Sequence, residues 1–120
     1  MSQFSSSWYS HFLARAATKP EPASVGVEHE ADLHAQIIDE CRRRRWQFLH
    51  GAMSERTART LGEPDFLILA DNGRVFFVEC KTRTGKLSIE QQAFKCAAEL
   101  NGHTIHIVRN IEQFLAVVNA

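Results

Sequence analysis

Two carboxylates and a lysine stand at the ends of a segment that otherwise has the pattern of a β-hairpin. In GEPDFLILADNGRVFFVECK, residues 62–81, Asp65 precedes one run of apolar side chains, and Glu79 and Lys81 close a second run. Runs rich in Val, Ile, Leu and Phe that are separated by turn residues are typical of paired strands. Charged groups are unfavourable at such positions unless they have a chemical task. These three residues are therefore the first candidates for catalysis.

The turn between the two runs determines which side chains meet. If residues 71–73 form a type I turn with the glycine in the left-handed conformation, Ala70 pairs with Arg74. Each step outward from that pair keeps the register, so Asp65 falls opposite Glu79. Directly opposed residues on antiparallel strands have Cβ atoms roughly 4.5 to 5.5 Å apart. The sequence therefore predicts two adjacent carboxylates at the open end of the hairpin.

A cation is the natural partner of two carboxylates this close, because they repel each other when both are ionised. Mg²⁺ typically binds one or two carboxylates together with phosphate oxygens of a substrate. The backbone carbonyl of Cys80 is a further candidate ligand. Strand alternation places Lys81 on the same face as Glu79, where its ammonium group can orient an attacking water or stabilise charge on phosphorus. The segment therefore has the features of a site that cleaves phosphodiester bonds.

The spacing of these residues is similar to a known nuclease signature. Pro64-Asp65 followed by Glu79-Cys80-Lys81 matches the PD-(D/E)xK pattern, and the chain also carries GKLSIEQQ at residues 85–92 and an acid on an upstream helix. From about residue 28 to the C-terminus it resembles the virus-type replication-repair nuclease branch, VRR-NUC, in its phage-like stand-alone form. The resemblance implies an α/β fold with a restriction-endonuclease-like αβββαβ core, a mixed central sheet flanked by helices, and a C-terminal helix. Together with the site residues, it leads us to expect a Mg²⁺- or Mn²⁺-dependent nuclease that hydrolyses phosphodiester bonds of DNA.

The upstream helix, expected over residues 28–45, carries Glu30 near the centre of its apolar stripe. One explanation is that an acid in the first turn complements the helix dipole. The resemblance supplies another, because an acid at the start of this helix belongs to the family's site. In that case Glu30 joins Asp65 and Glu79 as a metal ligand.

A second helix is expected from Ser88 to about Asn101, where Gly102 ends it. Ser88 and Gln91 fit a capping box, in which each side chain bonds to the backbone N–H of the other residue. The resemblance gives Gln91 a second role at the active site, in contact with substrate, a metal-bound water or Lys81. Both roles are compatible with the pattern.

Several further side chains are candidates for contact with nucleic acid. Arg56 and Arg59 lie in the polar loop immediately before Asp65, and Arg side chains are common phosphate ligands. His34 shares a helix side with Glu30, although packing is an alternative explanation for it. The remaining candidates are His50, at the end of a short strand expected over residues 46–50, and Lys86.

Length and composition limit the organisation of the chain. With 120 residues, the protein is expected to form one domain over residues 28–120, preceded by a flexible or docking arm over residues 1–27. No apolar run reaches the roughly eighteen residues that a membrane span needs, and no signal peptide is evident. A cytoplasmic location, in a bacterium or a phage-infected cell, is the expectation. The net charge of zero argues against a broadly basic nucleic-acid scavenger.

Two alternatives to a nuclease fit part of the pattern. A catalytically silent module of the same fold would bind branched or single-stranded nucleic acid, but carboxylates repel phosphate and serve no purpose in such a module. A structural partner in a phage or mobile-element complex leaves the acids unexplained. For an active enzyme, a junction, a flap, a nick and plain duplex all remain possible substrates. A homodimer is expected if both strands are cut together, and a phage replication or recombination protein is an expected partner.

Overall fold

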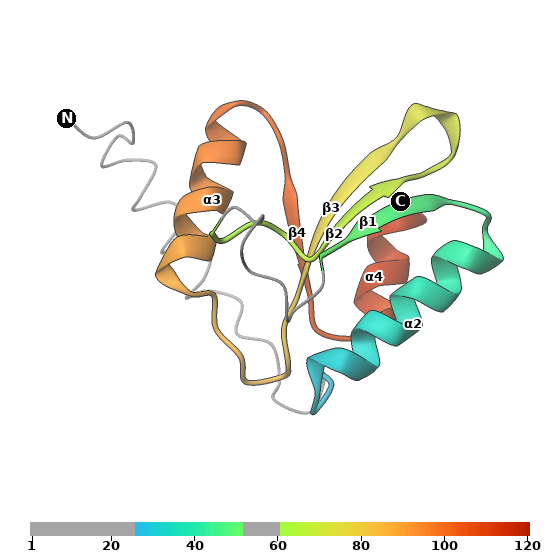
Figure 1. Ribbon diagram of the computed structural model, residues 1–120, viewed down its shortest axis with the longest axis horizontal. Helices are drawn as coiled ribbons and strands as arrows, with labels where there is room; N and C mark the ends of the chain where they lie inside the picture. Colours follow the sequence, from blue (N-terminus) through green and yellow to red (C-terminus); the bar gives the residue numbers. More distant parts are fainter. Residues whose placement is uncertain (1–25, 52–60) are drawn as a thin grey trace.

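The computed structural model describes residues 26–51 and 61–120. It is an α/β fold in which α2 and α4 cover one face of a four-stranded sheet and α3 lies on the other side (Figure 1). Within the described residues, no helix is long and apolar enough to cross a membrane. The elements in chain order are α2 (Glu30–Arg43), β1 (Gln47–His50), β2 (Phe66–Leu69), β3 (Val75–Cys80), α3 (Ile89–Leu100), β4 (Ile105–Val108) and α4 (Ile111–Val118). This order confirms the predicted αβββαβ core and its C-terminal helix.

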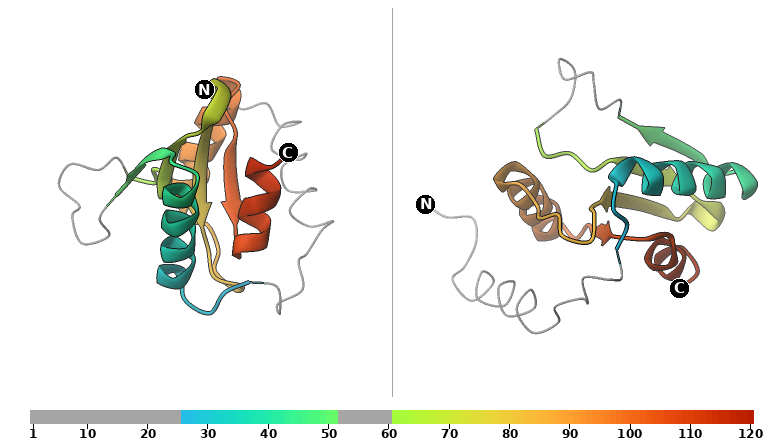
Figure 2. Two further views of the ribbon diagram at one scale, coloured as in Figure 1. Left: turned by 90° about the vertical axis from the view of Figure 1, so that its right-hand side faces the viewer. Right: turned by 90° about the horizontal axis from the view of Figure 1, so that it is seen from below.

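The sheet is mixed, as predicted. Its strands follow the order β1-β2-β3-β4, in which β1, β2 and β3 are antiparallel neighbours and β4 runs parallel to β3. A parallel neighbour requires a crossover connection, and α3 provides it. The two views in Figure 2 show that the crossover carries α3 to the side of the sheet opposite α2 and α4. This connection brings the start of α3 to the end of β3.

The hairpin of β2 and β3 has the predicted register. Leu69 pairs with Val75, and the Ala70 N–H donates to the Arg74 carbonyl at 2.8 Å. The predicted type I turn is wrong, because Asn72 has φ 56° and ψ 30° in addition to the positive φ of 72° at Gly73. Asn tolerates the left-handed conformation better than most residues. The register survives because it depends on which residues flank the turn and not on the turn's internal angles.

The hydrophobic core lies between the sheet and the two helices α2 and α4. Alternate residues of each strand point into this layer. Truncation of one large core side chain, as in Phe114→Ala, should lower the free energy of unfolding by about 3–5 kcal/mol. The core residues are Leu33, Ile37, Cys41, Trp46, Phe66, Ile68, Val78, Cys80, Val108, Phe114 and Val118. Leu33, Ile37 and Cys41 are the stripe that the spacing of the upstream helix predicts.

The opposite face of the sheet is only partly covered. Phe94 of α3 lies near Leu67 and Phe77, whereas the outward-facing side chains Leu69 and Val75 are exposed. The first turn of α3 is closed by the predicted capping box between Ser88 and Gln91. This face therefore combines an open apolar surface with the beginning of a helix.

The described chain begins with a segment that is joined to the body of the domain. The Val27 N–H donates to the Arg109 carbonyl at 2.7 Å, and the Val27 carbonyl accepts from the Arg83 N–H at 2.9 Å. Residues 1–25, which make up most of the expected N-terminal arm, lie outside the described residues.

Candidate active site

The three charged residues of the hairpin converge at its open end. Asp65 lies immediately before β2, in register with Glu79 near the end of β3, and Lys81 follows that strand. The Lys81 Nζ is 3.7 Å from the Glu79 Oε2, and the two side chains are 11% and 3% exposed. The Asp65 Oδ2 accepts a hydrogen bond from the Cys80 N–H at 2.8 Å. The convergence that the register predicts is therefore present in the structure.

Burial and charge change the proton affinity of Glu79. Loss of solvent, and then the nearby Asp65 carboxylate, raise the pKa of Glu79 to about 8, although the Lys81 charge acts in the opposite direction. A carboxyl group that holds a proton near neutral pH is unusual. In the absence of a cation, the Glu79 side chain is therefore mainly protonated at pH 7.

The pKa of Asp65 shifts in the opposite direction. Burial alone would raise its pKa, but the neighbouring His34 ring and the Cys80 N–H outweigh burial, and the net pKa is lowered. The pair thus holds one proton and one negative charge, a common arrangement when like charges are forced together. A divalent cation between the two groups would replace that proton and allow both to ionise.

Glu30 approaches the same place from a different element. It is the first residue of α2 and is half-buried. Its charge contributes to the raised pKa values of Glu79 and Cys80, which places its carboxylate within electrostatic reach of the hairpin's end. The first turn of α2 also contains Asp32, so the helix dipole and the site both account for acids at this position.

Gln91 links α3 to the hairpin. Its Oε1 accepts from the Ser88 N–H at 2.9 Å, which completes the capping box, and its Nε2 donates to the Glu79 Oε2 at 2.8 Å. The capping role and the position at the site are thus both present in one side chain. The side chain that receives the Gln91 amide hydrogen bond is Glu79, which is not among the partners named from the sequence.

Two histidines lie behind Asp65. His34 is buried, its Nε2 is 3.5 Å from the Asp65 Oδ2, and its Nδ1 is 2.9 Å from the Nε2 of His50. The His50 ring stacks on Phe66 with centroids 4.4 Å apart. His34 therefore faces a catalytic candidate from inside the fold, whereas the half-buried His50 stands closer to solvent.

The remaining candidate nucleic-acid contacts are Lys86, Arg56 and Arg59. Lys86 is exposed in the loop before α3. Arg56 and Arg59 lie outside the described residues. Of this group, the described residues therefore include one basic side chain, which is exposed to solvent.

Arg109 is a supporting residue that we did not predict from the sequence. Its Nη1 donates to the carbonyls of Thr82 and Gly85, in the loop that follows Lys81. The sequence gives no sign of this contact, because the end of β4 and the loop after β3 are far apart in the chain and are brought together only by the crossover. Arg109 holds the backbone that directs Lys81 toward Glu79.

A cleft opens beside Asp65 between the sheet and α3. Its volume is about 410 Å³. It is bounded by Leu49, His50, Gly51, Glu63, Pro64, Asp65, Phe66, Leu67, Phe77 and Phe94. The cleft gives a ligand with apolar parts access to the Asp65 carboxylate.

The fold is similar to that of a known structure. A solved structure described as a VRR_NUC domain aligns with a TM-score of 0.62 at 18% sequence identity, covering 75% of this chain and 94% of that chain. At this identity the similarity establishes the fold. No family profile matches the sequence, and no curated protein matches it. The resemblance identified from the motifs is therefore confirmed at the level of the fold.

Proposed function

We propose that this protein is a divalent-metal-dependent nuclease that hydrolyses phosphodiester bonds of DNA. The observation that carries the proposal is the convergence of Asp65, Glu79 and Lys81 at the open end of the hairpin, with the Lys81 Nζ 3.7 Å from the Glu79 Oε2. A fold gains no stability from two neighbouring buried acids, whereas a bound dication stabilises both as carboxylates. The similarity of the fold to a solved VRR_NUC domain supports the proposal.

The ligand set fits Mg²⁺ or Mn²⁺. Asp65 and Glu79 would hold the ion, with Glu30 approaching from α2 and the backbone carbonyl of Cys80 as a further oxygen ligand. All of these donors are oxygens, which hard cations prefer. When bound, such an ion activates water for attack and offsets the charge of the phosphate.

Two residues position the reacting groups. The Lys81 ammonium group lies beside Glu79, where it would orient the attacking water and stabilise negative charge that develops on the phosphate. The Gln91 amide holds the same Glu79 oxygen from the other side, so we assign it a positioning role. A fixed carboxylate loses less entropy when it binds the ion.

DNA would reach the acids through the cleft beside Asp65. Lys86, together with Arg56 and Arg59 of the loop before Asp65, would contact phosphates of the substrate. One site cuts one strand, so concerted cleavage of a duplex or junction requires two copies of the chain. A phage replication or recombination protein is the partner that the stand-alone form suggests.

The test is cleavage of labelled duplex, single-stranded, flap and four-way-junction DNA, each with Mg²⁺, with Mn²⁺ and with chelator. We expect metal-dependent products from the wild type and none from Lys81→Ala. Lys95→Ala is the matched control, because Lys95 pairs with Glu99 on α3, away from the acids. DNA binding without products under any metal would replace the nuclease by a silent binding module of the same fold.

A further inference from the structure

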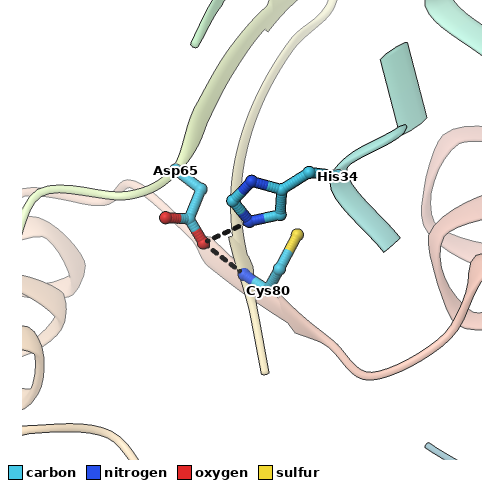
Figure 3. Close-up of side chains that lie close together, drawn as sticks. All are labelled: His34, Asp65 and Cys80. Atoms are coloured by element: carbon cyan, nitrogen blue, oxygen red, sulfur yellow. Dashed lines mark hydrogen bonds and ion pairs between the residues drawn. The ribbon is translucent and has the colours of Figure 1, made fainter. Parts of the chain in front are cut away.

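Asp65 belongs to a second group of side chains on its other side. The His34 Nε2, an Asp65 carboxylate oxygen and the Cys80 Sγ lie within 4.8 Å of one another (Figure 3). Because successive residues of β3 point to opposite faces, Cys80 meets this group from the core while Glu79 and Lys81 face the other way. The proposed catalytic ion would use only oxygen ligands, whereas this group offers nitrogen, oxygen and sulfur.

His34 has an unused ring nitrogen that is aimed into this group. Its side chain is 6% exposed, and its Nε2 has no hydrogen-bond partner among residues 26–51 and 61–120, although the Asp65 Oδ2 is 3.5 Å away. Buried nitrogens of this kind normally have a hydrogen-bond partner or a bound ligand. The other ring nitrogen, Nδ1, is 2.9 Å from His50, which fixes the orientation of the ring. A fixed second nitrogen is typical of histidines that bind metals.

We propose that His34, Asp65 and Cys80 form a binding site for Zn²⁺. Tetrahedral zinc with nitrogen and oxygen ligands separates those atoms by about 3.3 to 3.5 Å, close to the distance between His34 and Asp65. The sulfur needs an approach of only about 1 Å to reach bonding distance. Thiolate and imidazole favour zinc over Mg²⁺, so the two sides of Asp65 select different metals.

The charges of the loaded site balance. Burial and the nearby carboxylates raise the pKa of the Cys80 thiol, so the metal-free site keeps its S–H bond. On binding, the thiol proton leaves to solvent and the sulfur electron pair is donated to the ion. Zn²⁺, one thiolate, one carboxylate and a neutral imidazole then sum to zero. A neutral cluster is well suited to a buried position.

Zinc at this site would compete with catalysis. Zinc would bind the Asp65 carboxylate that the ion held with Glu79 also needs as a ligand, so the two ions would compete for it. If the proposed nuclease function is correct, Zn²⁺ therefore inhibits cleavage, and excess Mg²⁺ relieves the inhibition. Zinc binding itself does not depend on that function.

Co²⁺ is the direct probe, because a thiolate bound to it produces a charge-transfer absorption that Zn²⁺ abolishes by displacement. We expect this absorption in the full-length wild type and in Cys96→Ser, a matched control whose cysteine is not in the group. Cys80→Ser should lose it. His50→Ala should weaken Zn²⁺ binding about 10- to 100-fold, as expected for a residue that orients a ligand.

Several results would overturn the zinc site. They are a wild type without thiolate absorption, an absorption that survives in Cys80→Ser, and an absorption that is lost in Cys96→Ser. Should Cys80→Ser fail to fold, His34→Gln decides the question, because it keeps every cysteine and should still lose Co²⁺ binding. An unchanged Co²⁺ spectrum in His34→Gln excludes the site.

The cleavage assay separates this inference from the proposed function. A protein that shows the cobalt spectrum but cuts no DNA keeps its zinc site and loses its assignment as a nuclease. A protein that cuts DNA and shows no thiolate absorption keeps the nuclease function and loses the zinc site. In an active enzyme, Zn²⁺ should inhibit Cys96→Ser as strongly as the wild type.

Discussion

Gln91 holds the Glu79 carboxylate at 2.8 Å with the same amide group that caps α3. The start of the helix and the end of β3 are therefore tied together by one side chain. The capping box positions α3, and the position of α3 in turn places a hydrogen-bond donor beside a proposed metal ligand. Local helix stability and the geometry of the site are coupled at this residue.

Two substitutions can separate the helix-capping role of Gln91 from its role at the site. Gln91→Ala and Ser88→Ala each remove the capping box and should each lower the free energy of unfolding by about 0.5–2 kcal/mol. Only Gln91→Ala also frees Glu79, so it alone should reduce metal-dependent cleavage, by about 10- to 100-fold. Denaturant unfolding and cleavage rates measure the two effects. Equal losses of activity in the two variants would reduce Gln91 to a helix cap.

Glu79→Gln should stabilise the protein in chelator at alkaline pH. The folded-state pKa of Glu79 is raised from 4.5 to about 8. Between these two pH values, the folded protein therefore binds more protons than the unfolded chain. Stability from this group is complete at acid pH and is lost as the pH rises through about 8. The amide has no proton to lose, and the gain at pH 8 should be on the order of 4 kcal/mol.

Thermal unfolding in chelator at acid, neutral and alkaline pH measures this difference. The curves of the wild type and Glu79→Gln should converge on the acid side and separate toward pH 8. Glu112→Gln, at an exposed position in the first turn of α4, controls for the loss of an acid elsewhere. A constant difference between Glu79→Gln and wild type at every pH would contradict the shared proton.

Binding of Mg²⁺ should depend on pH through the same proton. The ion must displace the Glu79 proton, so its affinity should rise about tenfold per pH unit below about 8 and level off above it. Titration calorimetry in two buffers of different ionisation enthalpy should show about one proton released per ion at pH 7. Release of no proton would mean that Glu79 is already ionised in the metal-free protein.

Asp65→Ala should abolish cleavage without loss of the fold. The substitution removes a proposed ligand of the catalytic ion, and circular dichroism should show unchanged secondary structure. Asp71→Ala is the matched control, because this acid lies at the far end of the same hairpin in an ion pair with Arg74. Full activity of Asp65→Ala would remove the proposed mechanism.

The register of the hairpin could be predicted because it depends on local information. Once the turn residues were located, the pairing of Asp65 with Glu79 followed from the two-residue period of strands. The conformation of Asn72 did not follow, since several turns of equal length preserve the same pairing. Sequence pattern thus determined the partners better than the backbone angles between them.

The contacts of Asp65 with His34 and Cys80 could not be predicted from the sequence, because they depend on the tertiary structure. His34 meets Cys80 only because of the angle and depth at which α2 packs on the sheet, and neither residue has a neighbour in sequence that signals the other. Arg109 reaches the loop after Lys81 for a similar reason. The extent to which α3 covers the sheet, which leaves Leu69 exposed, also depends on packing and not on the apolar pattern of β2.

The alternation of Glu79, Cys80 and Lys81 on β3 makes the length of the distant turn important. If the turn kept its present length, insertion of one residue at positions 71–73 would shift the pairing of β2 with β3 by one position. The two faces of β3 would then be exchanged, with the cysteine turned outward and the two charged side chains turned into the core. Substitutions at the hairpin tip leave that assignment intact. The faces of β3 therefore depend on the number of residues at the tip, although no side chain there touches the site.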